Sequence, residues 1–158
     1  MRQHEKNAET LAAFLKTQPY VQKVLYPGLP EHPGYEIQKK QATGFGGMIS
    51  FYVDTPERAK KILEGISLIQ FAESLGGAES LMTYPRTQTH ADLTPEEAKE
   101  KGITDTLLRF SVGLEDVEDS RKTFCPSSKI SKTVSGLLPA IWGGSSFFIP
   151  CLYPNKRK

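Results

Sequence analysis

Apolar residues recur along the first 119 residues with two different periods, which predict helices and strands in turn. Residues 3–17 have the helical period, because their apolar side chains fall on one face and their charged side chains on the other. That apolar face consists of Ala8, Leu11, Ala12 and Leu15. Short apolar or alternating segments predict three strands, at 45–53, 66–71 and 107–113.

The segment 107–113 alternates most clearly of the three. One of its faces is apolar and consists of Leu108, Phe110 and Val112. The opposite face holds Leu107, Arg109 and Ser111. An arginine therefore stands in the middle of an otherwise apolar strand, where burial is costly unless an anion lies beside it.

Capping residues, proline and glycine mark the helix ends and loops. Thr55, followed by a proline, predicts a helix start. Residues 94–97, Thr-Pro-Glu-Glu, form a capping box, and Gly102 is placed to end that short helix. The Pro- and Gly-rich residues 24–35 predict a loop, and residues 113–119 predict the start of a closing helix. Helices and strands that interleave in this way predict an α/β fold, in the form of a small α+β domain.

The composition divides the chain at one point. All 18 acidic residues lie at or before Asp119, where they stand with 13 lysines and arginines, a net charge of −5. The last 39 residues carry seven basic side chains and no acid, and their helical periodicity stops at Ser120. We therefore expect a domain at 1–119 and a non-matching basic tail at 120–158, which is disordered or translated out of frame.

Composition also excludes several classes of protein. The overall net charge of +2 is too small to indicate a nucleic-acid partner. The apolar run 134–153 is interrupted by prolines and paired glycines, so no membrane-spanning helix is predicted. The N-terminus lacks the apolar core of a signal peptide, and both cysteines lie in the tail. These features predict a cytoplasmic protein.

Three other kinds of site are disfavoured. His4, His32 and His90 lie far apart without other ligands at metal-binding spacing, so no metal site is predicted. The glycine run 44–47 precedes a strand, which indicates a turn and not a nucleotide-binding loop. A hydrolase pair of Ser74 and His90 would lack the G-x-S-x-G motif.

Arg109 leaves two interpretations open. Its planar guanidinium suits a carboxylate held by two hydrogen bonds, and that carboxylate can belong to a ligand. It can equally belong to the protein, with Asp105 and Glu115 as candidates for a structural ion pair.

Several separated motifs resemble one enzyme family. The segment AESLGGAESL, followed by QTHA and then by GITDTLLRFSVGLEDVED, is similar to the C-terminal part of the transsulfuration enzymes that use pyridoxal phosphate. The segments RQHEKNAETLAAFL, VLYPGLPEHPGYEIQKKQ and GFGGMISF agree in order and spacing. The resemblance covers residues 1–119 and is to the Cys/Met-metabolism family, which includes cystathionine γ-synthases and cystathionine lyases.

The resemblance implies the C-terminal domain of a fold-type I pyridoxal-phosphate enzyme, with roles for five residues. In the family, the arginine at the position of Arg109 holds the α-carboxylate of the substrate. The pair at Ser74 and Leu75 lines the substrate side of the cofactor pocket, and Glu73 faces the distal end of the substrate. Thr89 belongs to the same wall.

The resemblance also implies a substrate, which is a sulfur amino acid or an activated homoserine, and a homotetramer for the complete enzyme. The reaction would be elimination or replacement at the β- or γ-carbon. Glu73 favours reaction at the γ-carbon.

Two departures from the family pattern bear on activity. The family's cofactor lysine follows Ser and Thr in the large domain, and neither Lys129 nor Lys132 of the tail has that setting. The family's final amphipathic helix is replaced after Asp119 by the basic tail, which is what a frameshift near that residue would produce. Equally, Met1 can be an internal start, so that the chain is a fragment of a longer gene product. We therefore expect a fragment that is inactive alone, or alternatively a non-catalytic module that docks on a full-length homologue.

Overall fold

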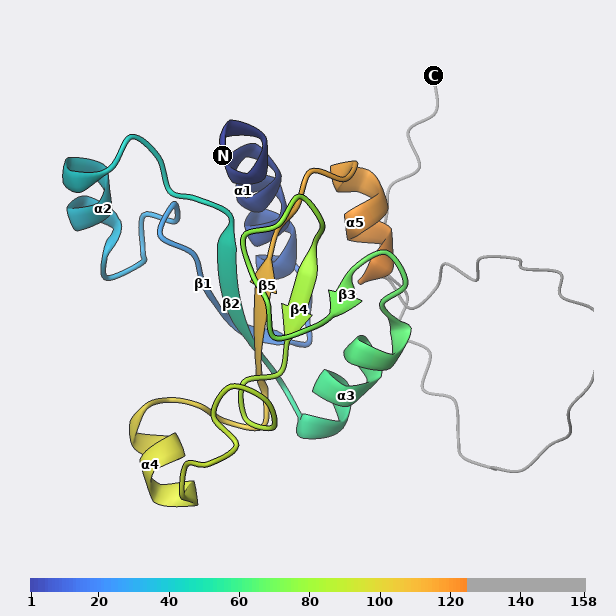
Figure 1. Ribbon diagram of the computed structural model, residues 1–158. Coiled ribbons are helices and arrows are strands. Elements are labelled where there is room, and N and C mark those ends of the chain that lie inside the picture. The colour runs from blue at the N-terminus through green and yellow to red at the C-terminus, as the bar shows by residue number, and fades with distance from the viewer. Residues whose placement is uncertain (125–158) are drawn as a thin grey trace, which may run out of the picture.

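The computed structural model describes residues 1–124, which form one mixed five-stranded sheet with helices around it (Figure 1). The strands lie in the order β1-β2-β5-β4-β3. Their bounds are Val21–Leu25 for β1, Met48–Val53 for β2, Gln70–Phe71 for β3, Leu81–Thr83 for β4 and Leu107–Ser111 for β5. Neighbouring strands are antiparallel, except that β3 and β4 are parallel.

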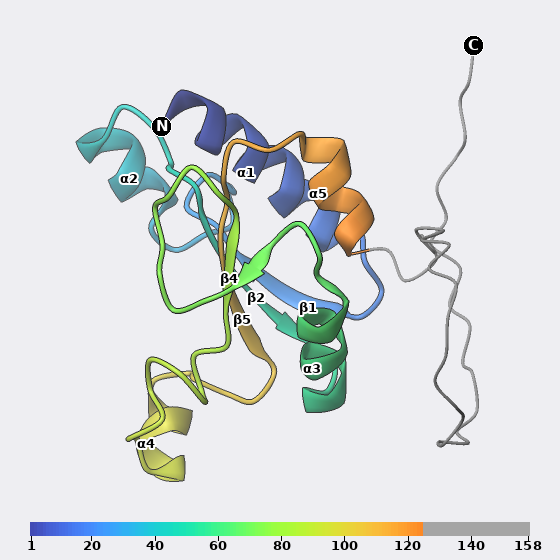
Figure 2. The ribbon, with the colours of Figure 1, turned by 45° about the vertical axis from the view of Figure 1, so that its right-hand side comes forward.

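Five helices accompany the sheet in these residues: α1 at Arg2–Lys16, α2 at Tyr35–Gln41, α3 at Pro56–Gly65, α4 at Pro95–Glu100 and α5 at Val117–Thr123. Helix α1 packs on β1, β2 and α5. Helices α2 and α4 project away from the sheet in both views (Figures 1 and 2). Helix α2 buries no residue, and α4 buries only Ala98.

The main core lies between the sheet and the side chains of α1, α3 and α5. Its strand contribution includes Phe51 and Phe110, both fully buried. Phe124, which directly follows α5, packs edge-on against both rings, at 6.2 Å from Phe51 and 5.6 Å from Phe110. Such edge-to-face contacts contribute about 0.5–1.5 kcal/mol each beyond the buried area. The fully buried apolar face of α1 is Ala8, Leu11, Ala12 and Leu15, as its period predicted.

The α/β prediction and most predicted elements are confirmed. Thr55 caps α3 by accepting a hydrogen bond from the amide of Arg58, and both hydrogen bonds of the predicted capping box are present at α4. Gly102 follows α4 with a φ of +71°, a conformation that favours glycine.

The predicted loop at 24–35 is confirmed, with small differences at its ends, because β1 ends at Leu25 and α2 begins at Tyr35. Two local expectations were wrong. The strand expected at 66–71 is confined to Gln70–Phe71, because only these residues pair with the short β4. Periodicity was expected to end at Ser120, yet α5 continues to Thr123 and buries Ser120. The predicted tail from residue 125 onward lies outside the described residues.

Within residues 1–124, no helix is both long and apolar enough to cross a membrane. The same residues contain no group of three or more His, Cys, Asp or Glu side chains that could hold a metal ion.

The capping box makes the stability of α4 depend on pH. Hydrogen bonds from the backbone amide and the hydroxyl of Thr94 hold the pKa of Glu97 below its ordinary value of 4.5. A carboxylate with a depressed pKa stabilises the helix above its unfolded-state pKa, and this contribution is lost as the pH falls through the folded-state pKa. We therefore expect α4 to lose helicity when the pH is lowered from about 6 to about 3.

NMR chemical shifts of residues 95–100 measure this change directly. Glu97→Gln keeps a side-chain acceptor but cannot titrate, so its α4 shifts should change much less over the same pH range. An equal loss of helicity in both proteins would contradict the assignment to Glu97.

Candidate functional site

The candidate site lies on the face of the sheet opposite the main core, around Arg109 in β5. Residues directly opposite on neighbouring antiparallel strands share a face. Arg109 pairs with Ser50 of β2 on one side and with Thr83 of β4 on the other. Ser111, two residues along β5, therefore lies on the same face.

Arg109 contacts neutral oxygens of the protein. Its Nη2 donates to the backbone carbonyl of Glu73 at 3.2 Å and approaches Oγ1 of Thr83 at 3.4 Å. Its Nε is buried and has no hydrogen-bond partner among the described residues. A buried donor without a partner is costly, so this nitrogen indicates a place for an additional acceptor.

Both acids considered as structural partners of Arg109 are engaged elsewhere. Asp105 lies 4.0 Å from Arg86. The carboxylate of Glu115 accepts hydrogen bonds from the amide and the hydroxyl of Ser80, at 2.6 and 2.7 Å. Within residues 1–124, no carboxylate lies within 4.0 Å of the Arg109 guanidinium. Of the two open interpretations, the structure thus favours a ligand anion.

A loop from Ala72 to Ala78 passes over this face and carries three of the predicted site residues. Glu73 joins Arg109 through its carbonyl, while its side chain is exposed. Ser74 and Leu75 are also exposed; Leu75 retains 54% of its accessible surface. The structure therefore brings Glu73, and with it the Ser74–Leu75 pair, to Arg109.

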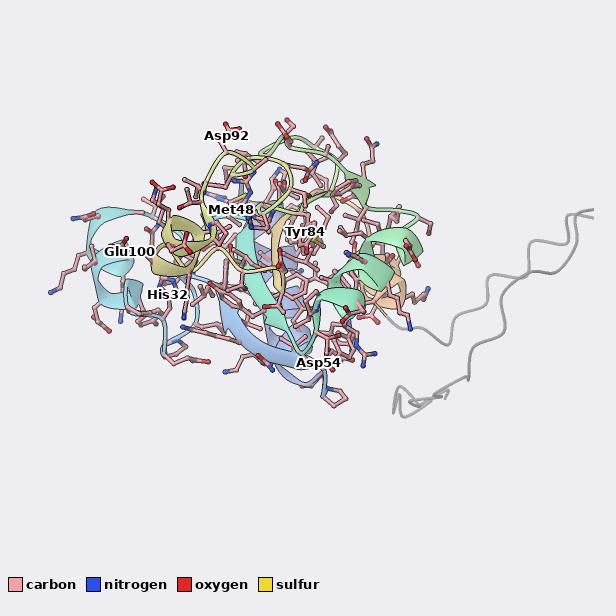
Figure 3. All side chains as sticks on the ribbon, turned by 90° about the horizontal axis from the view of Figure 1, so that it is seen from below. His32, Met48, Asp54, Tyr84, Asp92 and Glu100 are labelled. Carbon is pink, nitrogen blue, oxygen red and sulfur yellow. The ribbon has the colours of Figure 1, made fainter. Side chains whose placement is uncertain are left out.

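Thr89 shares no hydrogen bond with Arg109 or the loop among the described residues. It belongs to the turn between β4 and α4, and its hydroxyl lies 2.8 Å from Nδ1 of the adjacent His90. Asp92, three residues further along, lies at the edge of the molecule in the view of Figure 3. The place of Thr89 in the site stays a prediction.

A hydrogen-bonded corner behind the site was not recognised in the sequence. Ser80 donates to Glu115 and accepts from the amide of Gly113 at 2.9 Å. The side-chain amide of Asn7 in α1 donates to the carbonyls of Gly113 and Glu115, at 3.1 and 3.0 Å. The corner therefore ties together the end of β5, the start of β4 and helix α1. The sequence signal for it was Asn7, an asparagine at helical spacing from Leu11 on the apolar face of α1.

Comparisons with known proteins identify the family of this chain. A family model described as "Cys/Met metabolism PLP-dependent enzyme" matches residues 1–124. The chain is 48% identical over 120 residues to cystathionine gamma-lyase of Dictyostelium discoideum, which covers 75% of this chain and 31% of the relative. It is 44% identical over 137 residues to human cystathionine gamma-lyase, covering 86% and 34%. It is 50% identical over 119 residues to a Lactococcus lactis cystathionine beta-lyase, covering 75% and 31%.

Solved structures of related enzymes share the fold. Cystathionine gamma synthase from Xanthomonas oryzae pv. oryzae, in complex with cystathionine, matches with a TM-score of 0.75 and 39% identity, over 78% of this chain and 32% of that one. A putative O-acetylhomoserine (thiol)-lyase from Campylobacter jejuni matches with a TM-score of 0.74 and 33% identity, over 78% and 30%. The chain thus spans about a third of the length of the relatives it matches. It belongs to the family of Cys/Met-metabolism enzymes that depend on pyridoxal phosphate.

Proposed function

We propose that this chain is the C-terminal part of a pyridoxal-phosphate-dependent carbon–sulfur lyase or cystathionine γ-synthase, and that it is inactive alone. Its role is to hold the α-carboxylate of a sulfur amino acid or an activated homoserine. The observation that carries the proposal is the Arg109 guanidinium, which has a buried Nε without a partner and no carboxylate beside it among the described residues. A carboxylate fixed by this planar group orients the bonds at the substrate's Cα.

The exposed loop supplies the remaining contacts in this proposal. Ser74 and Leu75 line the substrate side of the pocket, and the Glu73 side chain faces the distal end of the substrate. Thr89 contributes to the same wall. These roles follow the family resemblance, and the hydrogen bond between Arg109 and the Glu73 carbonyl supports them because it brings the loop to the arginine. Glu73 favours elimination or replacement at the γ-carbon over the β-carbon.

The described residues fit the substrate and not the cofactor itself. When bound, pyridoxal phosphate acts as an electron sink for bonds at Cα. The family's cofactor lysine follows Ser and Thr, and no lysine in residues 1–124 has that setting. We therefore place the cofactor contacts in polypeptide beyond this segment, within a complete cytoplasmic enzyme that is a homotetramer. In this division, the domain predicted at 1–119 extends through α5 to Phe124, and the basic tail follows it.

A docking role is the second candidate. Six large apolar side chains of the described part are exposed, among them Phe71 at 51%, Leu75 at 54% and Leu114 at 49%. Exposed apolar side chains mark an interface where they form a contiguous patch. Such a chain would bind a full-length homologue as a non-catalytic subunit. Co-elution of the purified chain with that homologue would support this role, and separate elution would contradict it.

The enzymatic proposal can be tested with a chimera. Residues 1–124 of this chain would replace the matched segment of the Dictyostelium discoideum cystathionine gamma-lyase, to which the chain is 48% identical. We expect the chimera to bind pyridoxal phosphate and to cleave cystathionine, because the segment supplies the carboxylate-binding arginine. The 158-residue chain mixed with the cofactor should show no turnover.

Cofactor absorbance and cystathionine turnover are both measured in the chimera. A chimera that binds the cofactor but does not turn over cystathionine or activated homoserine with cysteine would contradict the proposal. The relative with its own segment, prepared in the same way, is the matched control.

A further inference from the structure

The loop that carries Glu73, Ser74 and Leu75 is not part of a helix or strand, yet it has defined anchors on the sheet. Three side chains provide these anchors: Thr83 at the end of β4, Arg109 in the middle of β5 and Ser111 at the end of β5. Arg109 is the proposed ligand contact, so its guanidinium serves both the loop and the substrate. The other two anchors have no such double role.

Ser111 provides the anchor at the far end of the loop. It is the last residue of β5 and retains only 4% of its accessible surface. Its Oγ accepts a hydrogen bond from the amide of Gly76 at 2.9 Å. Gly76 has a φ of +76°, so the backbone turns here in a conformation that few other residues adopt. The hydroxyl thus fixes the residue that immediately follows the Ser74–Leu75 pair.

Thr83 provides the anchor at the near end. It is the last residue of β4 and retains 1% of its accessible surface. Its Oγ1 donates to the carbonyl of Ala72 at 2.8 Å, the residue before Glu73. The same oxygen lies 3.4 Å from Nη2 of Arg109. The Thr83 hydroxyl therefore couples the start of the loop to the position of the guanidinium.

We propose that Ser111 and Thr83 are positioning residues, whose hydroxyls hold the segment 73–75 at a fixed place beside Arg109. Neither hydroxyl contacts the substrate. The two anchors bracket the three residues that the proposed function assigns to the pocket, and this inference rests on that function. Because a free loop would lose entropy on ordering around a ligand, preordering by the anchors strengthens substrate binding.

The first test needs no ligand and uses the 158-residue chain. In the unaltered protein, the amide of Gly76 should exchange its hydrogen at least about threefold more slowly than the amides of Ser74 and Leu75, after correction for intrinsic rates. Ser111→Ala should remove this protection, while the amide of Val112, bonded to Gly47 in the sheet, stays protected. Ser50→Ala is the matched control, because it removes a hydroxyl from the same face without an anchor to the loop.

A Gly76 amide that exchanges as fast as its neighbours in the unaltered chain would overturn the inference, even if Ser111→Ala fails to fold. Equal protection of Gly76 in Ser111→Ala and in the unaltered chain would overturn it as well. Thr83→Val, which keeps the side-chain volume, should accelerate exchange in the segment 73–76 by about two- to threefold.

The second test uses the active chimera. Ser111→Ala should raise KM for cystathionine about fivefold and change kcat by less than about twofold, because the loop contributes to binding in both the ground state and the transition state. Thr10→Ala, which removes a hydroxyl bonded to the Lys6 carbonyl within α1, should change neither constant. An unchanged KM in Ser111→Ala would overturn the positioning role. An inactive chimera would instead count against the proposed function, while the exchange measurement would still decide whether the hydroxyl holds the loop.

Discussion

Gly113→Ala should lower the free energy of unfolding by about 3 kcal/mol, a large part of the stability of a domain of this size. A Cβ at this position would lie 2.5 Å from the carbonyl oxygen of Ala78 and 2.5 Å from the carbonyl carbon of Glu79, and would also collide with the Glu115 carboxylate. The Ala78 oxygen already accepts a hydrogen bond from the amide of Leu114 at 2.7 Å. Moving these backbone atoms aside would break that hydrogen bond.

The collision would also disturb the corner behind the site. The amide of Gly113 donates to Ser80, whose hydroxyl donates to Glu115. Displacing this strand end would weaken both hydrogen bonds, each of which contributes about 1 kcal/mol or more. Urea unfolding followed by circular dichroism measures the loss.

Gly65→Ala is the control for a glycine replacement as such. Gly65 ends α3, and an added Cβ there would meet no atom within 4 Å. We expect no loss of stability, and a gain of up to about 1 kcal/mol, because alanine restricts the unfolded chain. Similar unfolding free energies for the two variants would show that the corner at Gly113 is not closely packed.

Arg109→Lys should lower kcat/KM for cystathionine about a hundredfold in the chimera. Lysine keeps the positive charge but lacks the planar pair of N–H groups that holds both oxygens of a carboxylate. Removing one partner of a desolvated, hydrogen-bonded charge pair costs about 2–5 kcal/mol, which agrees with a loss of this size. The absorbance of the bound cofactor should not change, since Arg109 is proposed to contact the substrate and not the cofactor.

Arg58→Lys is the matched control for this exchange. Arg58 pairs with Asp54 at 3.2 Å and lies over the ring of Tyr20, on contacts separate from those of Arg109. We expect the kcat/KM of Arg58→Lys to stay within about threefold of the unaltered chimera, because this partly exposed ion pair lies outside the proposed site and contributes little. A comparable loss in both variants would point to a general effect of arginine replacement and would remove the special role of Arg109.

Secondary structure was predictable where burial alone decides it. The apolar stripe of α1 and the alternation of β5 are confirmed because both elements pack on one apolar core, so their pattern records which face is buried. The cap at Thr55 was equally predictable, since a side-chain cap is a contact between residues three positions apart.

Elements stabilised by distant contacts were missed. Strand β1 exposes Gln22 and Lys23 and depends on its pairing with β2, interrupted by a bulge after Val21. Helix α2 has no buried face and is held by a stacked pair of rings, Tyr35 and Phe45, at 5.3 Å. Neither partner is near in sequence, so no local period marks these elements.

For the site, the residue types could be read from the sequence: an arginine in an apolar strand, a polar loop with paired glycines, and the family motifs that contain both. What surrounds Arg109 depends on how the chain folds. Asp105 and Glu115 are close to Arg109 in sequence, but the fold directs them to Arg86 and Ser80. Hydrogen-bond partners are set by where strands and loops meet in space. A guanidinium that contacts only a carbonyl and a hydroxyl among residues 1–124 still has N–H groups that can bind an anion.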